Sequence, residues 1–86
     1  MLTFLAKYEE RNGGEGCGMY NVPENECERA ANRLGYDISK GYEQGNWAHL
    51  PTGCFVGHSH TNWKYTYFNF NKGKTNNGFK SICINS

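Results

Sequence analysis

Aliphatic side chains are scarce in this sequence: only nine of its 86 residues are Leu, Ile or Val. A chain of this length buries only about 60–65% of the surface that its unfolded form exposes, so its core is marginal. Aromatic residues make up 15% of the chain and the net charge is only +1, which together exclude an intrinsically disordered protein. We therefore expect a single small cysteine-rich domain over residues 1–86 that depends on covalent cross-links.

Long hydrophobic runs are also absent. No apolar segment approaches the roughly 20 residues of a membrane-spanning helix, so we expect no membrane span. Met1–Ala6 is apolar, but it is too short for a signal peptide and no basic stretch precedes it. We expect the chain to be a mature protein or a module of a longer precursor.

The second half of the chain has no acidic residue. Residues 1–43 contain all eight Asp and Glu and five basic side chains, whereas residues 44–86 contain four lysines and no acid. This asymmetry permits attraction between copies of the chain, or an anionic partner for the second half.

The spacing of the cysteines excludes the common zinc-binding motifs. Cys17, Cys27, Cys54 and Cys83 contain no Cys-x-x-Cys pair. An even number of cysteines in a short chain with a small core predicts two disulfides and an oxidising compartment, here the extracellular space or the cell surface. The alternative is a set of four buried free thiols in a cytosolic protein.

Residue patterns predict an α+β fold with one helix. Pro23 suits the first turn of a helix, Gly35 suits its end, and apolar positions at Cys27, Ala30, Ala31 and Leu34 form one narrow stripe.

Residues 36–53 have the composition of a loop. Alternation or β-rich composition predicts strands at Leu2–Tyr8, which ends at the glycine-rich segment 12–16, and at Cys54–Val56, Trp63–Phe70 and Phe79–Ile84. We expect the helix to pack on a small, mostly antiparallel sheet of three to four strands, and the N-terminal strand within residues 1–12 could be exchanged with a neighbouring copy.

Side-chain alternation assigns two faces to this sheet. One face, which we expect the helix to cover, carries Phe68, Phe70, Ile82 and Ile84. The opposite face carries Trp63, Tyr65, Tyr67, Asn69 and Asn71. Cys54 can then point toward Cys27 on the helix, so we prefer the disulfides Cys27–Cys54 and Cys17–Cys83, although four cysteines allow three pairings.

Several short motifs occur in a recognisable order. They are Glu26-Cys27-Glu28 followed by Ala30-Ala31, then Pro51-Thr52-Gly53-Cys54, Tyr67-Phe68-Asn69 and Ile82-Cys83-Ile84. In this order the chain resembles an uncharacterised small cysteine-rich module of secreted proteins from algae and other protists. The resemblance covers most of the chain and implies an extracellular module, with no associated reaction.

Catalytic and metal-binding chemistry is poorly represented. His58 and His60 could share an ion with His49, but the second half offers no carboxylate, so we expect no metal site and no cofactor. Cysteines in disulfides cannot act as nucleophiles, and no serine carries a catalytic motif, so we expect no enzymatic activity. We also expect no nucleic-acid partner, because a charge of +4 over the second half is modest.

The aromatic face is the strongest functional feature. Trp63, Tyr65, Tyr67 and Asn69, together with Trp47 from the preceding loop, could form a binding face, since aromatic rings with polar ends suit protein interfaces and saccharides. Alternatively, the N-terminal strand or the 36–53 segment covers this face. We expect an extracellular structural or interaction module of the kind that self-assembles as a surface or filament subunit, and the alternative is a carbohydrate-binding, lectin-like module.

Overall fold

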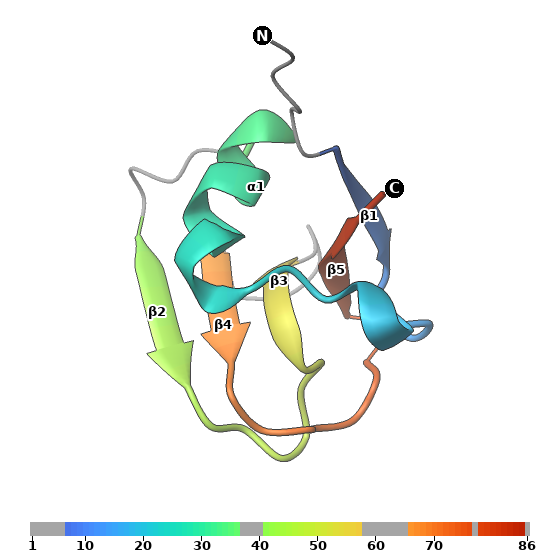
Figure 1. Ribbon diagram of the computed structural model, residues 1–86. Helices are drawn as coiled ribbons and strands as arrows, with labels where there is room; N and C mark the ends of the chain where they lie inside the picture. The colour runs from blue at the N-terminus through green and yellow to red at the C-terminus, as the bar shows by residue number, and fades with distance from the viewer. Residues whose placement is uncertain (1–6, 37–40, 58–65, 77, 86) are drawn as a thin grey trace, which may run out of the picture.

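A computed structural model describes residues 7–36, 41–57, 66–76 and 78–85. A five-stranded sheet carries one helix on one face (Figure 1). In chain order the elements are β1 (Tyr8–Asn12), the 3-10 turns η1 (Gly18–Tyr20) and η2 (Glu24–Glu26), the helix α1 (Cys27–Arg33), β2 (Tyr42–Gly45), β3 (Gly53–Gly57), β4 (Thr66–Asn69) and β5 (Phe79–Ile84). The predicted α+β class is confirmed.

The sheet has the strand order β1-β5-β3-β4-β2. All neighbouring strands are antiparallel except β2 and β4, which are parallel. The sheet has one strand more than the three to four that we expected, because β2 lies inside the segment predicted to be a loop. β2 has only four residues and ends at Gly45, so its composition gives a weak strand signal.

Within the described residues, the first strand extends beyond Tyr8, the last residue of the predicted alternation. β1 runs from Tyr8 to Asn12 and pairs along its whole length with β5, while Met1–Ala6 lie outside the described residues. Gly13 follows the strand directly, and its N–H donates to the Phe79 carbonyl at 2.8 Å. A Cβ atom at this position would lie 2.3 Å from the Asn76 carbonyl oxygen, so the close approach of the two segments requires glycine.

The predicted helical stripe faces the sheet. Cys27, Ala30 and Ala31 are fully buried and Leu34 packs beside them. The first turn, Glu24–Glu26, is a 3-10 turn, and Gly35 follows the helix with φ of +94°, a conformation that favours glycine. Among the described residues, no helix is long and apolar enough to cross a membrane.

Two apolar clusters lie on opposite faces of the sheet. Beneath α1, the buried cluster comprises Val22, Cys27, Ala30, Ala31, Cys54, Val56 and Ile82, with Phe68 and Ile84 at its margin. The other cluster comprises Leu50, Phe55, Tyr67 and Phe79, with Trp47 packed against it. Phe70, which we assigned to the helix-covered face, follows the end of β4 and is 59% exposed.

The two disulfides are those that we preferred from the sequence. Cys27–Cys54 joins α1 to β3, and Cys17–Cys83 joins the segment before η1 to β5. All four cysteines are at most 3% exposed. Disulfides of this kind persist in oxidising compartments, where the chain is therefore expected to function.

Candidate functional site

The predicted aromatic binding face is largely buried. Tyr67 is only 6% exposed and Asn69 only 1% exposed, so their assignment to an exposed binding face is wrong. The segment that follows β2 covers them: Trp47 packs edge-on against Tyr67, with ring centroids 5.9 Å apart, and Leu50 completes the cluster. This covering is the alternative considered above. Trp63 and Tyr65 lie outside the described residues.

Asn69 holds that covering segment in place. Its Oδ1 accepts hydrogen bonds from the backbone N–H groups of Trp47 (2.9 Å) and Asn71 (3.1 Å). Its Nδ2 donates to the carbonyl of Trp47 at 2.8 Å, and it also lies within hydrogen-bond distance of the carbonyls of Leu50 and Pro51. A buried amide with these contacts is a structural group, because its hydrogen-bonding capacity is used inside the chain.

Trp47 is half-buried and lies directly over Gly45. A Cβ atom at Gly45 would approach the Cζ2 atom of the indole ring to 2.2 Å. Phe55 meets the same indole ring edge-on, with centroids 6.3 Å apart. Trp47 therefore belongs to the core more than to a binding face.

The histidines form no metal site in the part of the chain that the structure describes. His49 is exposed, and His58 and His60 fall outside that part. No group of three or more His, Cys, Asp or Glu side chains within the described ranges is arranged to hold an ion.

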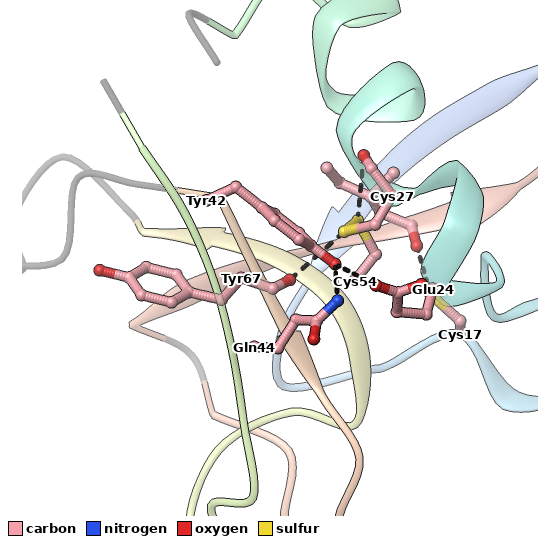
Figure 2. The surroundings of a disulfide bond; sticks show 8 residues. Cys17, Glu24, Cys27, Tyr42, Gln44, Cys54 and Tyr67 are labelled. Carbon is pink, nitrogen blue, oxygen red and sulfur yellow. Dashed lines mark hydrogen bonds between the residues drawn. A yellow bond between two sulfur atoms is a disulfide. The ribbon is translucent and has the colours of Figure 1, made fainter. Parts of the chain in front are cut away.

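Within the described ranges, three tyrosine hydroxyls donate to glutamates, and two of these glutamates lie in η2. Tyr8 on β1 donates to Glu26 at 2.8 Å, and Tyr42 on β2 makes a longer bond of 3.4 Å to Glu24. Figure 2 shows the second bond beside Gln44, whose amide also donates to the Tyr42 oxygen at 3.4 Å. One 3-10 turn is thus tied to both outer strands of the sheet.

The third bond joins Tyr36, just after α1, to Glu10 on β1. Burial is the main cause that raises the pKa of all three tyrosines, and the neighbouring glutamates raise it further. The pKa of Tyr42 rises to about 12. Glu10, Glu24 and Glu26, which belong to the acidic first half of the chain, thus accept hydrogen bonds within the chain.

β1 has a neighbour on one side only among the described residues. The N–H of Asn85 donates to the Lys7 carbonyl, and the N–H of Gly13 donates to the Phe79 carbonyl. The backbone N–H and C=O groups of successive residues in a strand point to alternate sides, so those of residues 7, 9, 11 and 13 point toward β5. The backbone groups of Tyr8 and Glu10 consequently face away from the sheet.

β2 is the outer strand at the opposite end of the sheet (Figure 1). The Gly41 carbonyl accepts from the Thr66 N–H, and the Gly45 carbonyl accepts from the Phe70 N–H. These two bonds show that the backbone groups of residues 41, 43 and 45 point toward β4. The backbone groups of Tyr42 and Gln44 therefore point outward. Outer strands with a neighbour on one side only in the described part of the chain are templates for pairing with another chain. Sequence reasoning missed β2, because four residues carry too little pattern to identify a strand.

A few apolar side chains are exposed near these elements. Met19 and Tyr20 on η1 are 85% and 40% exposed, and Tyr20 lines an open hollow of about 200 Å³ with Arg11, Ile84 and Asn85. Phe70 lies edge-on to Phe68, with ring centroids 5.0 Å apart. These side chains are scattered, so the two outer strands are the more coherent candidate surface.

Comparison of the chain with protein-family models, with curated proteins and with solved structures finds no match.

Proposed function

We propose that this protein is a non-enzymatic extracellular module that associates with copies of itself through the outer strands of its sheet. The observation that carries the proposal is the pair of strands β1 and β2, each with a neighbour on one side only among the described residues and with outward backbone groups at two alternate positions. Strand addition to such edges supplies main-chain hydrogen bonds. The two buried disulfides support the extracellular assignment.

Opposite edges of one sheet favour an open row over a closed dimer. When β1 of one protomer pairs with β2 of the next, the two surfaces in contact are different, which makes the interface heterologous. Repetition of a heterologous contact generates a ring or an open filament. This geometry agrees with a surface-layer or filament subunit.

Sedimentation velocity over a range of protein concentrations tests the proposal. We expect the full oxidised chain to form species larger than a monomer as concentration rises, and a monomer at every concentration would refute self-association. A variant that lacks residues 1–6 provides a second test in the same measurement. Edge pairing through Tyr8–Asn12 predicts that this variant still assembles, whereas exchange of the N-terminal segment between copies predicts that it does not.

A second candidate function is saccharide binding next to Phe70. Its exposed ring follows β4, and the adjacent Asn71 amide donates to the Asn46 side chain at 2.6 Å, so an aromatic face and two amides lie together. Rings and amides of this kind suit the apolar faces and hydroxyls of sugars. Binding on a glycan array that is lost in Phe70→Ala would support this function, and an array without signal for the wild type would reject it.

A further inference from the structure

The directions of the strands determine how two copies can meet. β1 is antiparallel to β5, β5 to β3 and β3 to β4, while β2 is parallel to β4. β2 therefore runs antiparallel to β1 across the sheet. A second protomer added in the same orientation presents its β1 antiparallel to β2 of the first, with both α1 helices on the same side of the extended sheet.

The alternation of backbone groups then restricts the register. Hydrogen-bonded pairs in this contact must join an outward residue of β1, such as Tyr8 or Glu10, to an outward residue of β2, such as Tyr42 or Gln44. The register can therefore change only in steps of two residues. A shift of one residue would also exchange the two faces of the added strand.

Charge distinguishes between the registers that remain. β1 carries Glu9, Glu10 and Arg11, whereas Glu43 is the only charged residue of β2. With Glu10 opposite Tyr42, Glu9 lies directly opposite Glu43, and like charges at such positions are destabilising. With Glu10 opposite Gln44, Arg11 lies directly opposite Glu43, and residues 8–12 align with residues 42–46 over their full length.

Arg11 and Glu43 are placed to make this contact. Arg11 lies opposite Ser81 in the β1–β5 ladder and Glu43 lies opposite Tyr67 in the β2–β4 ladder, so both side chains are on the sheet face away from α1. The Nε of Arg11 binds Glu9 within the chain. Its side chain is 34% exposed, and the guanidinium group has further N–H donors for a second carboxylate.

We propose that protomers join head to tail in the register that places Arg11 of one protomer beside Glu43 of the next. This inference rests on the proposed function, and it names both the partner, a second copy of this chain, and the residues that select the register. Pairing of β2 with β2 has no such advantage, because Tyr42–Gly45 contains no cation. Of the two registers that pair Glu10 with an outward residue of β2, the charges thus disfavour the one with Glu9 opposite Glu43 and favour the one with Arg11 opposite Glu43.

Charge reversal on each side tests the register. We expect Arg11→Glu and Glu43→Arg each to weaken assembly about fivefold or more, because each places like charges opposite one another. A mixture of the two variants should assemble again as a row in which the variants alternate. One variant then has glutamate at both positions 11 and 43 and the other has arginine at both, so every contact pairs an arginine with a glutamate. The double variant should also recover. Glu28→Arg, at an exposed position on α1, makes the same change in charge and should assemble like the wild type.

The outcomes separate this inference from the function on which it rests. A wild type that assembles, with single variants that assemble equally well or a mixture that does not recover, would refute the register and leave self-association standing. A wild type that stays monomeric would refute both. Far-ultraviolet circular dichroism and urea midpoints of the single variants establish that each remains folded, and recovery in the mixture is a result that a merely misfolded variant cannot give.

Discussion

The side chain of Asn69 pairs with both backbone groups of Trp47. The Trp47 N–H donates to Asn69 Oδ1 at 2.9 Å, and Asn69 Nδ2 donates to the Trp47 carbonyl at 2.8 Å. This two-way contact resembles the exchange of hydrogen bonds between residues of paired strands. It fixes the segment after β2 over the aromatic cluster and removes Tyr67 from solvent.

Replacement of the Asn69 amide should destabilise the folded chain. Asn69→Ala leaves the Trp47 N–H and nearby carbonyls without their partner, which we expect to lower the free energy of unfolding by about 2–3 kcal/mol. Urea denaturation followed by circular dichroism measures the change. Asn32→Ala, at an exposed position on α1, is the matched control and should change stability by less than about 0.5 kcal/mol. An equal loss in both variants would contradict the role of Asn69.

A methyl group at Gly45 should displace the indole ring of Trp47. The added Cβ would lie 2.2 Å from Cζ2, so Gly45→Ala requires the ring to move, at a cost of roughly 1–3 kcal/mol. The indole N–H resonance of Trp47 should shift, and the thermal midpoint should fall. Gly18→Ala is a suitable comparison: its φ is +60° but no atom lies within 4 Å, so it should lose stability through backbone strain without moving Trp47.

Stability should decline at alkaline pH. The pKa values of Tyr8, Tyr36 and Tyr42 are raised above the unfolded value of about 10, so the folded state retains protons that the unfolded state loses. Their stabilising contribution is complete below pH of about 10 and is lost as pH rises through the folded values, which is about 12 for Tyr42. Urea midpoints at pH 8 and pH of about 11 should therefore differ.

Tyr42→Phe should make this pH dependence shallower, because it removes one of the three titrating hydroxyls. Tyr20→Phe, whose hydroxyl takes no part in these three bonds, is the control. A wild-type midpoint that is constant over the same pH range would disprove the linkage.

The disulfides should resist reduction in the folded protein. All four cysteines are at most 3% exposed, so a thiolate reductant reaches them only after local or global unfolding. Intact mass after treatment with reductant should stay that of the oxidised chain in native buffer and increase by the mass of four hydrogens in denaturant. Rapid reduction of either bond in native buffer would show that the surrounding packing opens readily.

The helix and its stripe could be predicted from the sequence because their signals are local. Ala30 and Ala31 follow Cys27 at helical spacing, so all three lie on one face of the helix. Strand alternation directs Cys54 toward this face, and the pairing of Cys27 with Cys54 followed from that. The strand β2 could not be predicted in this way, since four residues provide too little pattern and its pairing with β4 is long-range.

The burial of the aromatic face could not be predicted from the sequence either. Alternation correctly placed Tyr67 and Asn69 on the face away from the helix, but it does not reveal what covers a face. The covering depends on a tertiary contact between Asn69 and Trp47, which are 22 positions apart. The sequence therefore identified the face, and the segment that buries it became visible only in three dimensions.

One proline substitution tests most directly whether copies associate through the outer strands. The N–H of Gln44 points away from β4, so Gln44→Pro removes an edge donor without breaking the ladder inside the chain. Gln44→Ala keeps this donor and is the matched control. Sedimentation equilibrium should show wild type and Gln44→Ala associating, with Gln44→Pro folded but monomeric; association of the folded Gln44→Pro variant at wild-type strength would contradict the account.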